Sequence, residues 1–398
     1  MEMIKINQIN LNQTLNQICV AYNNGINVYS TENFKCILSS NNNDFQLGNI
    51  QNATLIYDLN IVVFNGSSDN QEYNNKKLVF FDLNKNKEIY STRFENEISN
   101  IKSILLFILA TIGTELNIFL FKNNEFEIYK TINFPNKKFL NYEIWNIKDE
   151  NNESNNKIYL SLISEKKNCI EIQTFNNSFI EISNKIEVHI NFKEIQNIFY
   201  LKNLDYLCVV DIIAQYIGIY DYLNNKRLYY LYRGVNPGFI TSIINIDKNF
   251  IAISNSNRTI HIFDLTSLNK VNINTFFTNL LGKNILYSCC KIRFNDLFLQ
   301  KDERFFFKDF NEKGAILYNK KNSFEFNIIG YNGYIYTIKY IPLYFKYELL
   351  NKIFFAEVNF DNVKEININD DDFMNYTGLT EKEKKNINND ENNQWKII

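Results

Sequence analysis

The sequence is poor in the residues that shape tight loops and in those that carry most proton and metal chemistry. Its 398 residues include only 12 Gly, 3 Pro and 2 His. With 42 Lys and Arg against 44 Asp and Glu, it also lacks an excess of either charge. This balance argues against nucleic-acid binding, which needs clustered positive charge. Scattered acidic residues, so few His and no Gly-rich phosphate loop or nucleophile–base spacing argue against an enzyme.

Cysteine pairs and long apolar runs are missing as well. The six Cys form no CxxC motif, so neither a zinc site nor a redox motif is indicated, and we expect no metal or cofactor. Free, mostly buried thiols fit a cytoplasmic protein. The most apolar window, Ile104 to Phe121, is interrupted by Glu115 and Asn117, and its uninterrupted part is too short to cross a bilayer. The N-terminus lacks an apolar run of signal-peptide length.

Aromatic residues and Asn are abundant. The 34 Phe and 25 Tyr, together with many Ile, favour strands, and a hydrophobic fraction of 45% is enough for a large core. Asn fills about one position in six and stands between strand-like runs, for example at Asn23-Asn24-Gly25 and Asn332-Gly333. Because Asn tolerates positive φ better than any residue except Gly, we expect it to replace Gly at many hairpin turns.

A short strand motif recurs seven times along the chain. Its copies (INVYS, LVFFDL, LNIFLF, IEIQTF, IGIYDY, IHIFDL and YIYTIK) begin at Ile26, Leu78, Leu116, Ile170, Ile217, Ile260 and Tyr334. Successive copies begin 38 to 74 residues apart, which brackets the period of propeller blades, about 40–45 residues. After five of the first six copies a short turn leads into another strand: TENFKCIL, NKNKEIY, NNEFEIY, NNSFIEI and NNKRLYYLY.

These repeats predict an all-β fold, a seven-bladed WD40-like β-propeller over residues 1–357. Seven sheets around an axis bury their faces against one another and leave only short edges exposed. The acidic and mixed-charge segment 358–398 is predicted to be a flexible tail.

The sixth copy of the motif breaks the pattern. After IHIFDL, the stretch Thr266 to Asn284 intervenes before the next strand-like run, ILYSCCKIRF. An insertion of about twenty residues in a repeat protein is a place where function tends to lie. Its large apolar residues have a spacing that places them on one side of a short helix; they are Phe276, Phe277, Leu280 and Leu281.

The segment Leu228 to Leu265 carries the most informative polar residues. Arg233-Gly234 stands at a strand end, where a guanidinium can bind phosphate bidentately and Gly permits close approach of the backbone. Side chains that can hydrogen-bond a phosphorylated sugar follow about twenty residues later; they are Ser254, Asn255, Thr259 and His261. Arg-Gly pairs and Ser/Thr turns are also common on propeller surfaces, so the spacing alone leaves a surface role open.

This stretch resembles the PROPPIN family, the WD-repeat β-propellers (including the WIPI proteins) that bind phosphoinositides. The family hallmark is Phe/Leu-Arg-Arg-Gly followed by Ser-Ser…Gly-Thr-Val-His-Ile-Phe, and this chain has LYRG and then SNSNRTIHIFDL. Weaker similarity extends from about Leu11 to Ile341. The resemblance implies binding of phosphatidylinositol 3-phosphate or the 3,5-bisphosphate at the propeller rim. It also implies autophagy or lipid-transfer proteins as partners, and peripheral recruitment from the cytoplasm to autophagic or endolysosomal membranes.

Matched residue by residue, the resemblance implies one headgroup site between the fifth and sixth blades. Five residues occupy the family's positions: Arg233, Gly234, Ser254, Thr259 and His261. Asn255 replaces a Ser of the family pattern. Arg258 replaces a Gly, where its side chain either adds a phosphate contact or projects into water.

The family's other pocket is not retained by the same comparison. Tyr232 replaces the first Arg of the pair, Asp211 replaces a Ser, and Gly218 aligns with an Arg. A carboxylate and the loss of two cations oppose phosphate binding, and His189, a match for the pocket's His, would be isolated. We therefore expect one functional site rather than two.

In this family the long loop of the sixth blade inserts into the bilayer. The resemblance thus implies that Phe276, Phe277, Leu280 and Leu281 insert, with Lys270 and Lys283 nearby. An alternative is that these side chains pack against the propeller itself. For the whole protein, the competing hypothesis is a protein-interaction scaffold that has lost lipid binding. The sequence chooses neither the preferred phosphoinositide nor the protein partner.

Overall fold

The computed structural model describes most of the propeller and little of the chain beyond it. The described residues are 5–40, 47–57, 59–122, 125–133, 142–147, 157–164, 168–176, 181, 186–190, 192, 194–202, 204–266, 285–297, 315–319, 324–331, 333–355 and 365–366. The fold and the site are built from these ranges.

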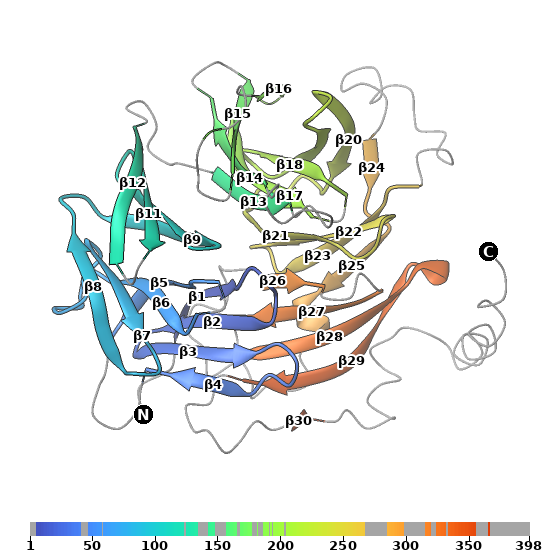
Figure 1. Ribbon diagram of the computed structural model, residues 1–398. Coiled ribbons are helices and arrows are strands. Elements are labelled where there is room, and N and C mark those ends of the chain that lie inside the picture. Colours follow the sequence, from blue (N-terminus) through green and yellow to red (C-terminus); the bar gives the residue numbers. More distant parts are fainter. Residues whose placement is uncertain are drawn as a thin grey trace.

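Seven sheets, antiparallel except for one added strand in the fifth, follow one another along the chain and are arranged around a common centre (Figure 1). The first sheet consists of β1 (Ile6–Leu11), β2 (Gln17–Tyr22), β3 (Gly25–Ser30) and β4 (Cys36–Ser39). The second consists of β5 (Ile50–Leu55), β6 (Ile61–Gly66), β7 (Lys77–Asp82) and β8 (Lys87–Arg93). The third consists of β9 (Ile98–Ile104), β10 (Phe107–Ile112), β11 (Glu115–Lys122) and β12 (Glu125–Asn133).

The remaining four sheets complete the ring. The fourth contains β13 (Tyr142–Ile147), β14 (Lys157–Ile163), β15 (Cys169–Phe175) and β16 (Ile186–His189). The fifth contains β17 (Ile195–Leu201), β18 (Tyr206–Asp211), β19 (Tyr216–Asp221), β20 (Lys226–Tyr232) and β24 (Ile285–Tyr287). The sixth contains β21 (Ile240–Asn245), β22 (Phe250–Asn255), β23 (Thr259–Asp264) and β25 (Cys290–Arg293). The seventh contains β26 (Ala315–Tyr318), β27 (Glu325–Gly330), β28 (Tyr334–Ile341), β29 (Lys346–Phe354) and β30 (Glu365–Ile366).

The predicted all-β seven-bladed propeller is confirmed, and each copy of the recurring motif is the third strand of a sheet. The copies are β3, β7, β11, β15, β19, β23 and β28. Helical structure in the described part is limited to α2 (Phe294–Leu297) and the short 3-10 turn η5 (Pro342–Tyr344). The fourth strand of the fourth sheet differs from the expected one: of NNSFIEI the structure describes Asn176 and Glu181, and Glu181 forms an isolated bridge with Phe175, while the fourth strand is β16.

A hydrophobic cluster fills each interface between successive sheets, because both faces of an inner strand are buried. The cluster that closes the ring joins Ile6 and Tyr29 of the first sheet to Ile353 on β29 and to Phe355, which directly follows that strand. The rings of Tyr29 and Phe355 meet edge to face, with centroids 5.2 Å apart. No strand is exchanged between the first and last sheets within the described ranges, and this cluster packs the two sheets together.

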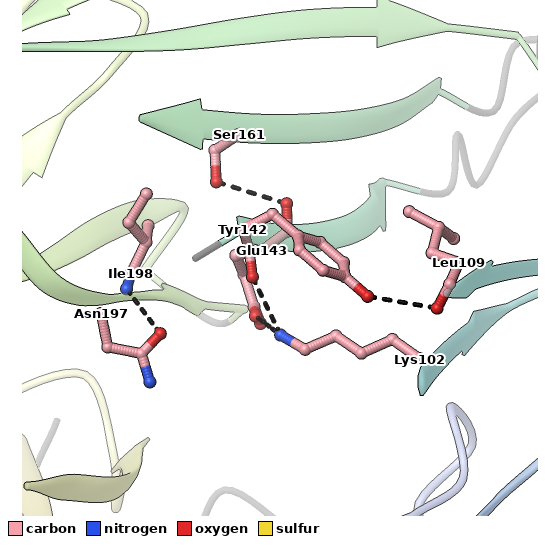
Figure 2. A network of polar contacts seen from close by, with 7 residues as sticks. All are labelled: Lys102, Leu109, Tyr142, Glu143, Ser161, Asn197 and Ile198. Carbon is pink, nitrogen blue, oxygen red and sulfur yellow. Dashed lines mark hydrogen bonds and ion pairs between the residues drawn. The ribbon is translucent and has the colours of Figure 1, made fainter. Parts of the chain in front are cut away.

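Polar contacts join the first strands of neighbouring sheets. Figure 2 shows Lys102 Nζ on β9 contacting Glu143 Oε2 at 2.5 Å and the carbonyl oxygen of Tyr142 at 3.1 Å, both on β13. Gln13 adds a longer link, since its Nε2 donates to Asn146 Oδ1 on the fourth sheet at 2.6 Å. These bonds hold the sheets in register around the ring.

The run ILYSCCKIRF, which we expected as one strand after the insertion, is divided between two sheets. β24 pairs in parallel with β20 of the fifth sheet, beside which it lies in Figure 1, and β25 completes the sixth sheet against β23. Burial explains the division: Leu286 enters the cluster between the fifth and sixth sheets, and Ile292 enters the cluster between the sixth and seventh.

The predicted flexible tail, 358–398, lies outside the described residues except for β30, which pairs antiparallel with β29. Within the described ranges, no helix is long and apolar enough to cross a membrane. All six Cys are free thiols, and four of them are buried.

Candidate functional site

Arg233 lies directly after β20 and connects two loops. Its side chain is only 5% exposed; Nε donates to the carbonyl oxygen of Ala214 at 2.6 Å, and Nη2 donates to the carbonyl oxygen of Asn236. The first acceptor belongs to the β18–β19 turn and the second to the link between the fifth and sixth sheets. Among the described residues, none accepts a hydrogen bond from Nη1. The guanidinium is thus fixed by the backbone, with one nitrogen left for a ligand.

Two opposing effects act on the Arg233 charge. Burial lowers the pKa of the guanidinium, and the nearby carboxylate of Asp211 raises it in part. Asp211 is itself held in the β18–β19 turn, where its Oδ1 accepts the backbone N–H of Tyr216 at 3.0 Å. Burial raises the pKa of this carboxyl group, and hydrogen bonds and Arg233 oppose that rise. The carboxylate of Asp211 therefore partly offsets the positive charge of the site.

Asn255, Thr259 and His261 lie together on the face of the sixth sheet that packs against the fifth. Asn255 pairs with Thr259 in the β22–β23 register, and its Nδ2 donates to Thr259 Oγ1 at 3.0 Å. His261 Nε2 lies 3.2 Å from the same hydroxyl. Since Ile253, the register partner of His261, belongs to the cluster between these two sheets, the three polar side chains share its face.

His261 reports a positive electrostatic environment. It is 4% exposed, and its pKa is lowered to about 3, first by burial and then by the charges of Lys291 and Arg233. The imidazole is therefore neutral near pH 7. Its Nδ1 is buried and finds no hydrogen-bond partner in the described part of the chain. In the tautomer that carries its proton on Nδ1, this neutral imidazole can donate a hydrogen bond to an anionic ligand.

Ser254 does not join this group, although the sequence places it there. It pairs with Ile260 and so lies on the opposite face of the sheet. It is fully buried, and its Oγ accepts hydrogen bonds from Ala315 N and Thr241 Oγ1, each at 3.2 Å. Ser254 thus connects the sixth sheet to the seventh.

The other two predicted site residues have backbone roles. Gly234 has φ +134°, a conformation that side chains disfavour, and the space around its α-carbon is open. Arg258 has a left-handed φ of 58° in the β22–β23 turn, where its N–H donates to the carbonyl oxygen of Asn255.

Sequence reasoning missed Lys291 and Arg293. In the β23–β25 register they pair with His261 and Thr259, so they project from the same face as those residues. Both are exposed, and neither makes an ion pair with any described residue. The signal was available, since basic residues alternate with buried Ile292 directly after the insertion.

Near the positions where the resemblance would place a second phosphate pocket, the fifth sheet carries a row of tyrosines. Tyr216 pairs with Tyr232, which pairs with Tyr287 on β24; the ring centroids are 5.2 and 5.4 Å apart. A Cβ added at Gly218 would lie 2.5 Å from the Tyr220 ring, so an Arg has no room there.

His189 lies away from this row on the fourth sheet. Its Nδ1 is 3.1 Å from Cys169 Sγ, and its backbone N–H donates to Asn225. The predicted inserting residues, Phe276, Phe277, Leu280 and Leu281, lie outside the described residues. Among the described side chains, no group of three or more His, Cys, Asp and Glu could hold a metal ion.

Comparisons with known proteins place this geometry in a structural context. The sequence matches no family model and no curated protein. The structure is similar to Kluyveromyces lactis Hsv2, with 14% identity and a TM-score of 0.63 over 89% of this chain and 100% of that one. It is also similar to KlHsv2 with loop 6CD replaced by a Gly-Ser linker: 15% identity and a TM-score of 0.60, covering 88% of this chain and 98% of that one.

A third similar structure is the complex of KlAtg21 with the coiled coil of AgAtg16. It is 15% identical with a TM-score of 0.55, and the match covers 84% of this chain and 94% of that one. Hsv2 and Atg21 are PROPPIN proteins. The chain shares the propeller fold of these proteins. At this level of identity the similarity extends to the fold and not to the residues of the site.

Proposed function

We propose that this chain is a divergent PROPPIN that binds a phosphoinositide through one headgroup site between its fifth and sixth sheets. The observation that carries the proposal is the placement of exposed Lys291 opposite buried His261 in the β23–β25 register, with the Thr259 hydroxyl 3.2 Å from the imidazole. Burial first, and then the charges of Lys291 and Arg233, lower the pKa of His261. A phosphate there gains charge-assisted hydrogen bonds and offsets two like charges.

Each residue of the proposed site makes a different contact with the ligand. Nη1 of Arg233 binds a phosphate. A phosphate oxygen or an inositol hydroxyl forms hydrogen bonds with Thr259 Oγ1 and with His261 Nδ1. Asn255 orients Thr259, and Gly234 lets the lipid approach the backbone. Lys291 and Arg293 then stand where a second phosphate would be favoured. The ligand we propose is phosphatidylinositol 3-phosphate, the 3,5-bisphosphate, or both.

Recruitment requires more than one weak contact. We propose that the Thr266–Asn284 loop adds apolar contact with the bilayer, so that headgroup and interface act together. The site and the fold support a binding role rather than catalysis. As partners we propose autophagy or lipid-transfer proteins, on autophagic or endolysosomal membranes reached from the cytoplasm.

One observation favours the second candidate, a scaffold without lipid binding. Arg233 is 5% exposed, and two of its nitrogens already donate to backbone carbonyls, so its purely structural role is complete without a ligand.

Titration calorimetry with inositol 1,3-bisphosphate, the soluble headgroup of phosphatidylinositol 3-phosphate, separates the two candidates. The wild-type chain should bind, Arg233→Gln should lose at least tenfold in affinity, and the neighbouring Tyr232→Phe should not change it. Arg233→Lys, which keeps the charge, should retain part of the affinity. Absence of binding by a folded wild-type chain would leave the scaffold.

A further inference from the structure

Four large apolar side chains are exposed on the two loops that Arg233 connects. Ile212 and Ile213 lie in the β18–β19 turn and are 51% and 42% exposed. Val235 and Phe239 lie in the link between the fifth and sixth sheets and are 70% and 67% exposed. We call these four residues the collar. Ile213 and Val235 directly precede Ala214 and Asn236, whose carbonyl oxygens accept the hydrogen bonds of the buried guanidinium.

The fifth sheet fixes the backbone beneath the collar. Gln196 is 8% exposed; its Nε2 donates to the carbonyl oxygens of Ile212 and Gly238 at 3.2 and 2.7 Å, and its Oε1 accepts Ile240 N–H at 2.9 Å. The Gly238 N–H donates to the carbonyl oxygen of Ile213 at 3.3 Å. Two buried polar side chains, Gln196 and Arg233, therefore cross-link the two loops.

The sixth sheet fixes the same link from its other side. Phe239 N–H donates to Ser256 Oγ at 2.9 Å, and Ser256 N–H donates to the carbonyl oxygen of Phe239 at 2.8 Å. Asn257 Nδ2 donates to the carbonyl oxygen of Pro237 at 2.8 Å. These hydrogen bonds fix the backbone of both loops, while the four collar side chains remain exposed. An exposed apolar patch of this kind marks an interaction surface.

The hydrogen bonding of the backbone in these two loops indicates what kind of partner covers the collar. Most of the loops' backbone polar groups already have partners inside the protein: the carbonyl oxygens of Ile212, Ile213, Ala214, Asn236, Pro237, Gly238 and Phe239 all accept hydrogen bonds. A protein partner normally forms hydrogen bonds with loop backbone of this kind. A bilayer instead demands that backbone groups be satisfied internally.

We propose that the collar enters the boundary between headgroups and acyl chains of an anionic bilayer, with Arg233 meeting a lipid phosphate at its centre. The charge distribution favours this occupant, because two positive side chains, Arg233 and Lys291, outweigh one neighbouring carboxylate, Asp211. This inference rests on the proposed headgroup site, and it adds an insertion surface distinct from the Thr266–Asn284 loop.

The test is flotation of the full-length protein with phosphatidylcholine–phosphatidylserine vesicles, with and without 5% phosphatidylinositol 3-phosphate. Val235→Ser combined with Phe239→Ser should reduce partitioning onto both vesicle types at least tenfold. Binding of soluble inositol 1,3-bisphosphate should stay within twofold of wild type. A matched control, Ile128→Ser with Leu343→Ser, alters residues 53% and 64% exposed on the third and seventh sheets and should float like wild type.

The possible outcomes separate the collar from the headgroup site. A collar variant that floats like wild type, with an unchanged melting temperature, overturns the collar alone. Loss of soluble headgroup binding by a folded collar variant also overturns it, because the site itself would then have been damaged. A wild-type chain that binds neither vesicle type contradicts the collar as a membrane surface. If wild type floats but does not bind the soluble headgroup, the headgroup site fails while a tenfold effect of the collar variant still supports the collar.

Discussion

At the scale of single residues, Arg233 joins two loops through backbone carbonyl oxygens, and we propose that its remaining donors bind a ligand. A change of charge beside Arg233 should therefore change its affinity for an anionic ligand. Asp211 is the carboxylate that lowers the positive potential at this point, and its backbone contact needs only an oxygen acceptor.

Asp211→Asn should therefore strengthen phosphoinositide binding. The amide keeps an Oδ1 acceptor for Tyr216 N–H while removing one negative charge beside the site. A charge near an anionic membrane surface is worth about 1 kcal/mol, which corresponds to roughly a fivefold gain in affinity. Vesicle flotation at low and physiological salt measures it, and weaker binding by an equally stable variant would refute the electrostatic argument.

His261 should make the fold sensitive to acid. Its folded pKa of about 3 is lower than the ordinary 6.5, so between these values the unfolded chain holds a proton that the folded chain does not. Stability contributed by the neutral imidazole is thus present above about pH 6.5 and lost as the pH falls, at up to about 1.4 kcal/mol per pH unit. Urea unfolding of wild type and His261→Gln at pH 7, 6 and 5 tests this. The difference between the two should shrink or reverse toward pH 5; a constant difference would argue against it.

Side-chain identities predicted part of the site, and strand geometry explains the rest. The sequence brought Arg233, Asn255, Thr259 and His261 together, because the motif spans one hairpin and the strand end before it. It could not show that Ser254, one position from Asn255, points to the opposite face of the sheet. Successive side chains of a strand point to opposite faces, but the sequence does not say which face packs against which neighbouring sheet.

The expectation that Asn replaces Gly at turns was only partly right. Of the eleven non-Gly residues with positive φ in the described part, only Asn86, Asn168 and Asn225 are Asn. Many Asn act through their side chains instead, as when Asn255 Oδ1 accepts Asn257 N–H at 2.8 Å within its turn.

At the scale of elements, the connection after β23 is more than an insertion. Its last residues form β24, which extends the fifth sheet before the chain returns to the sixth. Repeat spacing could not predict this, because a parallel three-residue strand has no local sequence signal. The long segment between β23 and β24 is therefore bounded by strands on two different sheets.

Replacing residues 267–284 by a Gly-Ser linker should leave the propeller folded, since β24 and β25 keep their partners. The melting temperature should fall by no more than a few degrees, while flotation with vesicles that contain phosphatidylinositol 3-phosphate should drop at least several-fold. Equal flotation of the two proteins would favour packing of Phe276, Phe277, Leu280 and Leu281 on the propeller.

Leu286→Ala tests the structural part of the same connection. Leu286 on β24 is 2% exposed within the cluster between the fifth and sixth sheets. Its truncation should lower the free energy of unfolding by about 2–5 kcal/mol. Leu343→Ala, at a residue 64% exposed, is the control and should change it by less than about 0.5 kcal/mol. Equal effects of the two substitutions would show that β24 is not part of the folded sheet.

At the scale of the whole molecule, the near balance of charge means that the membrane attraction we propose must be local. The repeat count predicted seven blades because each blade leaves its own trace in the sequence. It could not predict how the ring closes, because closure by packing between Tyr29 and Phe355 leaves no repeat of its own.

Phe355→Ala should destabilise the entire propeller. The residue is 2% exposed in the cluster that joins the first and last sheets, and loss of such a side chain costs about 3–5 kcal/mol. Urea unfolding should show this loss as an earlier transition, whereas Phe345→Ala, at a residue 47% exposed, should unfold close to wild type. An unchanged transition for Phe355→Ala would show that the ring is closed in another way.

The central claim is one phosphoinositide site centred on Arg233. Calorimetric titration of the wild-type chain and of Arg233→Gln with inositol 1,3-bisphosphate tests it most directly, with melting temperatures as the check on folding. The claim predicts one binding event per chain, weakened at least tenfold in Arg233→Gln and unchanged in Tyr232→Phe. Two equivalent events, equal binding by a folded Arg233→Gln variant, or no binding by wild type would contradict it.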